Sequence, residues 1–356
     1  MCVVELRSVF PVFWPHAVMS MNKLSEMRPG KRLIDPLGRT IDYVRLSVTD
    51  KCNLRCTYCM PEGNRAFEAR QQYLSYDETE RIIRAFTELG VRRVRITGGE
   101  PLVRKNLPDL ASRLSALPGL EDLSLSSNAV LLADQAEALR GAGIERLNIS
   151  LDTLRRDRFL EITGNDDFDR VLDGLMVARQ AGFAPIKINM LALRGRNDDE
   201  VIDMAEFCIE HGFSLRFIET MPMGSAGRAA TRHYMPLSDV RAQLETKFDL
   251  VPSVMSGGGP ARYYRIDGSD STLGFITPMS RHFCDTCNRV RLSVNGTLHL
   301  CLGQTHSVPL RPLLQAGIDD DGLKKTLVEA LKLKPARHEF GEKPEQIIRF
   351  MSSTGG

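Results

Sequence analysis

Short β-branched runs alternate with helical patterns between residues 40 and 220, and this alternation constrains the fold more than any other feature. Strands are expected at 43–49, 91–99, 120–128, 144–152, 185–193 and 214–220, with helices between them at 75–89, 107–117, 132–142, 169–181 and 198–211. Glycines that suit left-handed helix ends follow several of these helices, at positions 90, 143, 182 and 212. Such repetition predicts a parallel sheet with right-handed crossovers. Six units are too few for a closed barrel of about eight, so we expect an α/β fold of the partial (βα)6 TIM-barrel type.

The pattern changes after about residue 230. A helical stretch at 237–248 leads to the Gly-rich piece SGGGPARYYRI and then to short strands around LGFITP and VRLSVNGTLHLCL. The NG pair at 295–296 is typical of a tight hairpin. We therefore expect an N-terminal extension of unknown role over 1–33, a partial barrel over 34–230 and a C-terminal α+β region over 231–356.

Composition excludes several classes of protein. Of the 356 residues, 42% are hydrophobic and 26% are charged, which is typical of a globular protein. The 47 basic and 45 acidic residues give a net charge of +2, a surplus too small to indicate a nucleic-acid binder. Any bound anion must therefore be held by locally clustered charge. No apolar run reaches the length of about 18 residues that a membrane span needs, so we expect a cytoplasmic protein with no membrane partner.

The stretch KCNLRCTYCM holds three cysteines, Cys52, Cys56 and Cys59, just after the first expected strand. Tight cysteine clusters in a long chain without a secretion signal indicate metal sites in a reducing compartment. Structural zinc usually takes four ligands, and this loop has no histidine. Three thiolates suit an iron–sulfur cube in which one iron stays open for a small molecule. A zinc site and a chance group of buried thiols are the alternatives.

A second group, Cys284, Cys287 and Cys301, lies in FCDTCNRVRLSVNGTLHLCL. The C-x2-C pair is followed by a third cysteine across the expected hairpin, and three histidines are nearby, at positions 282, 299 and 306. Taken alone, this pattern is a good candidate for a zinc site with a histidine as the fourth ligand.

The motif C-x3-C-x-aromatic-C, followed by GGEP at 98–101, resembles the radical S-adenosylmethionine (SAM) superfamily. The resemblance implies that the first triad holds a [4Fe–4S] cluster whose open iron binds SAM. The reduced cluster would then cleave SAM to a 5′-deoxyadenosyl radical. It also implies SAM contacts at Tyr58, Gly99, Ser150 and Met221.

RITGGEPL, NISLDTL, IKINM, RFIETMPMG and the closing GG, together with both cysteine stretches, resemble the GTP 3′,8-cyclase family, also called the molybdenum cofactor biosynthesis protein A family. The match runs in order from about residue 34 to 356. It implies a second [4Fe–4S] cluster on the second triad, whose open iron faces the guanine of GTP. It further implies a lyase that removes the C3′ hydrogen of GTP and closes a C3′–C8 bond. The product would be (8S)-3′,8-cyclo-7,8-dihydroguanosine 5′-triphosphate, formed in the first step of molybdenum cofactor biosynthesis.

Partners and substrate contacts follow from the same resemblance. It implies an electron donor, a homodimer, a downstream cofactor-biosynthesis enzyme, and a Gly355–Gly356 tail that enters the active site. It places these residues around GTP: Arg45, Arg95, Ser126, Lys187, Arg289, Val290 and Arg291. Arg289 and Arg291 alternate on one strand and so share a face, and arginine offers planar paired donors to phosphate oxygens. The alternative is another radical SAM enzyme with an auxiliary cluster that acts on a peptide.

Overall fold

The structure is a computed structural model that describes residues 32–60, 63, 67–255, 258–269 and 271–355. The extension expected over 1–33 therefore lies outside the described residues, apart from Arg32 and Leu33. The backbone N–H of Leu33 donates to the carbonyl of Leu89 at 3.2 Å. Within the described ranges, no helix has the length and apolarity needed to cross a membrane.

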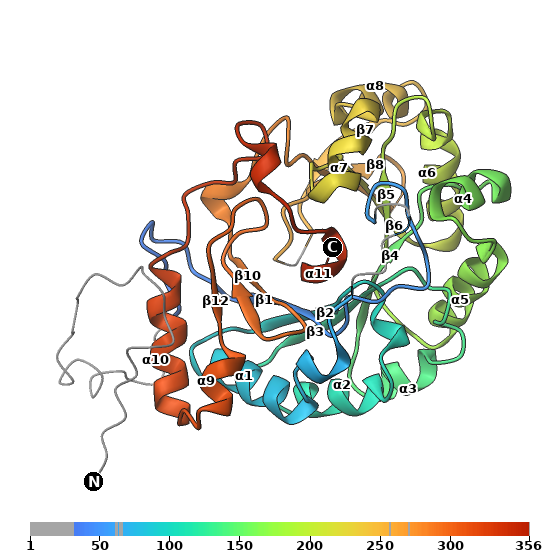
Figure 1. Ribbon diagram of the computed structural model, residues 1–356. Coiled ribbons are helices and arrows are strands. Elements are labelled where there is room, and N and C mark those ends of the chain that lie inside the picture. The colour runs from blue at the N-terminus through green and yellow to red at the C-terminus, as the bar shows by residue number, and fades with distance from the viewer. Residues whose placement is uncertain (1–31, 61–62, 64–66, 256–257, 270, 356) are drawn as a thin grey trace, which may run out of the picture. The chain divides into compact units, whose positions relative to one another are not determined.

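The six expected strands all form and pair in parallel, side by side in chain order (Figure 1). They are β1 (Tyr43–Ser47), β2 (Arg93–Thr97), β3 (Asp122–Ser127), β4 (Arg146–Ser150), β5 (Ile186–Leu191) and β6 (Ser214–Ile218). The partial barrel of the sequence analysis is thereby confirmed.

The C-terminal region adds strands at both edges of this sheet. They are β7 (Leu250–Ser253), β8 (Arg262–Ile266), β9 (Thr272–Ile276), β10 (Arg289–Leu292), β11 (Thr297–His299) and β12 (Ser307–Pro309). β9 pairs in parallel with β6, and β10 pairs in parallel with β1. β8 and β7 continue one side antiparallel, and β11 and β12 continue the other, so a single 12-stranded sheet results. The expected NG hairpin is confirmed, because Arg291 on β10 pairs with His299 on β11.

The helices are α1 (Tyr76–Glu88), α2 (Leu107–Ser115), α3 (Ala136–Gly141), α4 (Arg156–Thr163), α5 (Phe168–Gln180), α6 (Val201–His211), α7 (Gly224–Ala230), α8 (Leu237–Glu245), α9 (Arg311–Gln315), α10 (Asp320–Leu331) and α11 (Met351–Thr354). Most of the helices lie on the outside of the sheet, whereas α11 lies at the centre (Figure 1). Helix α1 begins with a capping box in which Ser75 and Glu78 satisfy each other's backbone N–H groups. The sequence analysis did not foresee α4, α7, α9 or α11.

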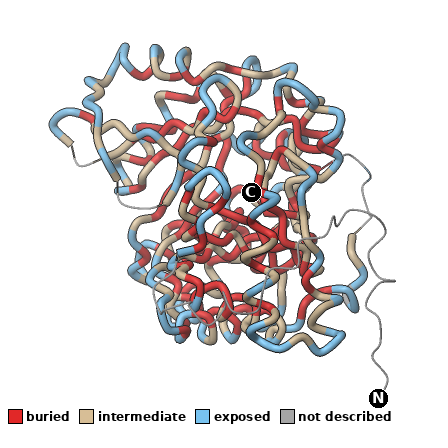
Figure 2. The backbone as a smooth tube through the Cα atoms, turned by 90° about the vertical axis from the view of Figure 1, so that its left-hand side faces the viewer, coloured by how far each residue is buried: buried red, intermediate tan, exposed pale blue. Residues whose placement is uncertain are grey.

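Alternation along the strands separates an apolar face from a polar one. Val44 and Leu46 of β1 are at most 1% exposed and belong to the main hydrophobic core. Figure 2 shows that buried residues are concentrated in the interior of the described chain. Arg45 lies between Val44 and Leu46 and therefore points to the opposite face. In register, Arg45 lies opposite Arg95 of β2 on one side and Arg291 of β10 on the other. The fold thus brings three guanidinium groups together at one level of the sheet.

Candidate active site

The first cysteine triad lies in the loop after β1. A turn in which the N–H of Cys59 donates to the carbonyl of Cys56 at 2.9 Å brings two of the thiols to the same region. All three thiols line a cavity of about 210 Å³ at the carboxyl ends of the strands. Burial raises the pKa of Cys52 to about 11 and that of Cys59 to about 12, and it raises the pKa of Cys56 as well. These thiols stay protonated at neutral pH until a metal displaces their protons.

The GGEP motif holds this loop in place. The N–H of Gly99 donates to the carbonyl of Thr49 at 2.8 Å, and the N–H of Glu100 donates to that of Lys51 at 2.8 Å. A Cβ on Gly98 would lie 2.3 Å from the Thr49 oxygen, and one on Gly99 would lie 2.5 Å from the Lys51 oxygen. Only glycine allows the two segments to approach this closely.

Glu100 joins a third segment to the same loop. Its buried carboxylate accepts hydrogen bonds from the Ser127 hydroxyl at 2.9 Å and from the Asn128 backbone N–H at 2.7 Å. Burial raises the pKa of Glu100 to about 7, and these donors oppose that rise. The side-chain amide of Asn128 in turn donates to the sulfur of Cys52 at 3.7 Å. The sequence analysis missed Asn128 as a site residue, although it directly follows β3.

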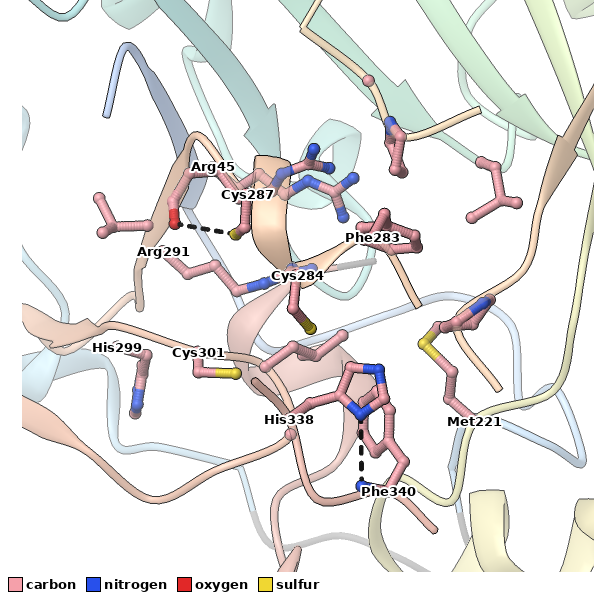
Figure 3. Close-up of a pocket in the computed structure, with 18 of the residues that line it drawn as sticks. Arg45, Met221, Phe283, Cys284, Cys287, Arg291, His299, Cys301, His338 and Phe340 are labelled. Carbon is pink, nitrogen blue, oxygen red and sulfur yellow. Dashed lines mark hydrogen bonds between the residues drawn. The ribbon is translucent and has the colours of Figure 1, made fainter. Parts of the chain in front are cut away.

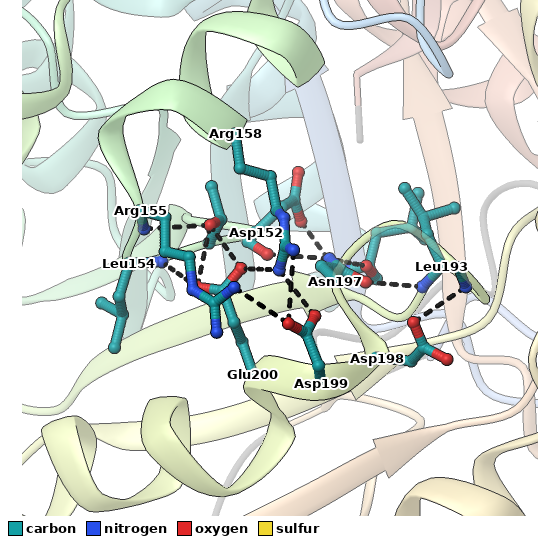
Figure 4. Close-up of polar contacts among 12 residues, drawn as sticks. Asp152, Leu154, Arg155, Arg158, Leu193, Asn197, Asp198, Asp199 and Glu200 are labelled. Carbon is teal, nitrogen blue, oxygen red and sulfur yellow. Dashed lines mark hydrogen bonds and ion pairs between the residues drawn. The ribbon is translucent and has the colours of Figure 1, made fainter.

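Tyr58 is fixed by a residue that the sequence analysis also missed. Its hydroxyl donates to the carboxylate of Asp152 at 2.6 Å, and the other Asp152 oxygen accepts from the N–H of Leu191 at 2.7 Å. Figure 4 shows Asp152 beside Asn197, whose amide donates to the Asp152 carbonyl at 2.7 Å. Burial raises the pKa of Asp152 to about 6. The only sequence signal was its place in the SLD motif that ends β4.

The structure brings the residues assigned to SAM together. Tyr58, Gly99, Ser150 and Met221 all line the cavity of the first triad. Ser126, assigned to GTP, lines this cavity too and does not line the neighbouring one.

The second triad lines a separate cavity of about 150 Å³ (Figure 3). Cys284 and Cys287 share a short turn closed by a 3.0 Å backbone hydrogen bond, and the β10–β11 hairpin brings Cys301 to them. Val290 also lines this cavity. The two cavities adjoin, because Asn189, Ile218 and Met221 line both of them.

Buried and half-buried arginines surround the second cavity, and none of them forms an ion pair with an acid among the described residues. Five of its lining residues are arginines: Arg45, Arg95, Arg216, Arg289 and Arg291. Burial lowers the pKa of each of them, and repulsion between neighbouring arginines adds to the effect. The Nε atoms of all but Arg291 are buried with no hydrogen-bond partner among the described residues. Since unpaired buried charge is costly, this arrangement is suited to a polyanionic ligand.

Lys187 of β5 is not among the residues that line either cavity. Its ammonium lies 5.5 Å from the ring centre of Tyr263, and burial together with Arg216 lowers its pKa to about 7. The sequence analysis placed Lys187 at the substrate, and the structure places it within the same basic group.

The C-terminal segment reaches the two cavities. Met351 and Ser352 of α11 line the first cavity, and the Arg291 guanidinium donates to the carbonyls of Thr354, at 3.4 Å, and Gly355. Figure 1 shows α11 at the centre of the view, over the sheet. Gly356 lies outside the described residues.

Each triad fits an iron–sulfur cube. In such a cube each cysteine binds a different iron, so the thiols surround a space rather than converge on one point. The described residues contain no group of three His, Cys, Asp or Glu side chains placed to hold a single metal ion, and the thiols of each triad line a cavity instead. Of the nearby histidines, His299 contacts Arg349, and burial lowers its pKa to about 3.

A parallel sheet with a three-cysteine loop at its carboxyl edge, braced by GGEP, defines a radical SAM protein. Residues 46–208 match the radical SAM superfamily, and residues 213–340 match the family described as molybdenum cofactor synthesis C. SuiB of Streptococcus suis bound to S-adenosylmethionine has the same fold, with a TM-score of 0.56 at 16% identity over 80% of this chain and 67% of that one.

Among curated proteins, this chain is 49% identical to the GTP 3′,8-cyclase of Ectopseudomonas mendocina over 91% of its own length and 99% of the relative. It is 47% identical to the GTP 3′,8-cyclase of Hydrogenovibrio crunogenus over the same shares. The chain belongs to the GTP 3′,8-cyclase family.

Proposed function

We propose that this chain converts GTP to (8S)-3′,8-cyclo-7,8-dihydroguanosine 5′-triphosphate with SAM as the radical source, in the first step of molybdenum cofactor biosynthesis. One observation carries the proposal: two cysteine triads line adjoining cavities, and the second cavity is surrounded by arginines that have no counter-ion among the described residues. A peptide substrate, the alternative, would leave these charges without a partner unless the peptide were itself acidic.

The first cavity would hold the SAM-binding [4Fe–4S] cluster on Cys52, Cys56 and Cys59. When bound, this cluster supplies the single electron that cleaves SAM. Tyr58, fixed by Asp152, and the backbone at Gly99 would position SAM beside it. The chain's own contribution is a rigid wall built from segments held together by Glu100 and Asp152.

The second cavity would hold the second cluster on Cys284, Cys287 and Cys301, with the guanine of GTP toward it. Arg45, Arg95 and Arg291, in register on neighbouring strands, would bind the triphosphate. Met221 lines both cavities, so the ribose of GTP would face SAM at this boundary. Ser126 and Ser150, both in the first cavity, would contact the two ligands near the same boundary.

The C-terminal segment would complete the site. Arg291 binds the carbonyls of Thr354 and Gly355, so the tail lies beside a residue that we assign to GTP. A tail in this place would exclude water from the radical. We also propose that 34–230 and 231–356 act as the SAM-binding and the second-cluster regions.

The cellular setting is part of the proposal. The seven described cysteines form no disulfide, which suits a reducing compartment such as the cytoplasm. We propose a low-potential electron donor, a homodimeric assembly and a downstream cofactor-biosynthesis enzyme as partners.

The test is anaerobic reconstitution with iron and sulfide, followed by incubation with SAM, GTP and a reductant. We expect about four irons per triad, 5′-deoxyadenosine and the cyclised triphosphate, measured by iron assay and mass spectrometry. Cys56→Ala should abolish 5′-deoxyadenosine. Cys287→Ala should lose irons from the second triad and the cyclised product. Cys208→Ala, which changes a buried cysteine of α6 outside both cavities, is the matched control.

Retained SAM cleavage in Cys56→Ala would refute the role of the first triad. Zinc at the second triad would refute the second cluster, and modification of a peptide with no GTP product would refute the substrate assignment.

A further inference from the structure

Lys334, just beyond α10, is a buried ammonium with no acidic partner. Its residue is 5% exposed, and it forms no ion pair within the described part of the chain. Its Nζ instead donates to two backbone carbonyls, those of Arg289 at 2.9 Å and Leu300 at 2.6 Å. Carbonyl dipoles solvate an ammonium only in part, so a counter-charge is expected close by.

The two carbonyls belong to the second cysteine triad. Leu300 directly precedes Cys301, and the Arg289 carbonyl also accepts from the sulfur of Cys287 at 3.9 Å. Lys334 therefore lies against the backbone that carries two of the three thiols. It also links β10 to the segment after β11.

We propose that Lys334 is a counter-charge of the second cluster: it balances the negative thiolate–iron–sulfur unit and makes that cluster easier to reduce than it would be without the ammonium. The proposal rests on the proposed function, which places a cluster on this triad. Reduction adds one electron from a low-potential donor and increases the negative charge beside the ammonium. The reduced form is therefore stabilised, and the reduction potential rises.

The test uses the full-length chain with Cys52, Cys56 and Cys59 changed to Ala, so that every signal comes from the second triad. In this parent, Lys334→Gln keeps a hydrogen-bond donor but removes the charge, and Lys334→Arg keeps the charge. Lys325→Gln, which removes a charge from an exposed position on α10, is the matched control. The readouts are iron per chain and the midpoint potential from a redox titration followed by electron paramagnetic resonance.

We expect Lys334→Gln to shift the midpoint to a more negative potential, and Lys334→Arg and Lys325→Gln to stay near the parent. If Lys334→Gln loses the cluster while Lys334→Arg keeps it, the requirement for charge is equally supported. An unchanged midpoint in Lys334→Gln, or loss of the cluster from both Lys334 variants, would overturn the proposal. A parent that binds no iron would instead refute the second cluster itself, which is a different result from an unchanged potential.

Discussion

The side-chain amide of Asn128 lies 3.7 Å from the sulfur of Cys52 and donates to it, and Glu100 holds the Asn128 backbone at 2.7 Å. The GGEP motif therefore acts on the cysteine loop in two ways, through its own backbone and through Asn128. A hydrogen bond to a cluster sulfur stabilises the reduced form and raises the potential.

Asn128→Asp removes this donor and adds a negative charge, while the side-chain oxygen that accepts from Val130 is kept. We expect the midpoint potential of the first cluster to become more negative, measured in a variant whose second triad is changed to Ala. Ser127→Ala, which removes a neighbouring hydroxyl bound to Glu100 but not to sulfur, is the control. An equal shift in both variants would mean that Asn128 acts only by packing.

Substitution of Arg289 tests whether the arginines around the second cavity bind the phosphates of GTP. Arg289 is 9% exposed, its Nε has no partner among the described residues, and its guanidinium lies 5.7 Å from the ring centre of Tyr43. We expect Arg289→Ala to weaken GTP binding by about 1.5–3 kcal/mol, the range for a hydrogen bond to a charged group. Arg265→Ala, at a half-exposed arginine that faces Asp267, should leave GTP binding unchanged in calorimetric titration. Equal affinities for the two variants would remove Arg289 from the phosphate site.

We expect GTP binding to weaken as pH rises, because the Lys187 ammonium loses its proton near neutral pH. Burial and neighbouring arginines hold its pKa at about 7 in the free protein. A bound triphosphate favours the charged ammonium and raises that pKa, so binding takes up a proton above about pH 7. Affinity should therefore fall as pH rises from about 7, by at most about tenfold per pH unit, until the pKa of the complex is reached.

Proton uptake can be measured by titration calorimetry in buffers of different ionisation enthalpy. Lys187→Arg stays charged and should abolish both the uptake and the pH dependence. If the dependence persists unchanged in Lys187→Arg, another group titrates.

Gly355, near the end of the C-terminal segment, has no room for a side chain. Its φ is +75°, and a Cβ there would lie 2.1 Å from the Thr97 methyl carbon, at the end of β2. Gly355→Ala should displace the tail and lower the rate of cyclisation. The melting temperature should stay close to that of the wild type, because the substitution does not change the sheet or its core. Gly341→Ala, where a Cβ meets nothing within 4 Å, is the control. Full activity in Gly355→Ala would show that the position of the tail does not matter for catalysis.

Local patterns predicted the parts of this fold that depend on neighbours in the chain. The β-branched runs and helical periods predicted β1 to β6, and Gly90, Gly143, Gly182 and Gly212 do adopt positive φ. Clustered cysteines predicted two sites, since residues close in sequence must be close in space. Tyr58 and Asp152 are 94 positions apart, so their contact depends on the packing of loops, which the sequence alone did not reveal.

The edges of the sheet were missed for a related reason. β9 and β10 are 5 and 4 residues long, and their sequences do not specify which strands they pair with. Pairing across more than 200 positions, as between Val44 and Val290, is decided by which edges the rest of the fold leaves open. Similarly, no motif identified Lys334, because only the completed structure shows that it is buried with no acidic partner among the described residues.

The C-terminal region supplies the strands that pair with both β1 and β6, the two edges of the parallel sheet. Both edges therefore stay unpaired until the end of the chain has been synthesised. When only β1 to β6 have been synthesised, the backbone N–H and C=O groups on the outer sides of β1 and β6 have no strand to pair with. Such unpaired edge strands promote aggregation. The thiols of the first triad have by then been made, whereas Cys284 and Cys301 have not. A chain that ends after β6 would therefore keep the first triad but would be prone to aggregate, so the last third of the polypeptide protects the rest during synthesis.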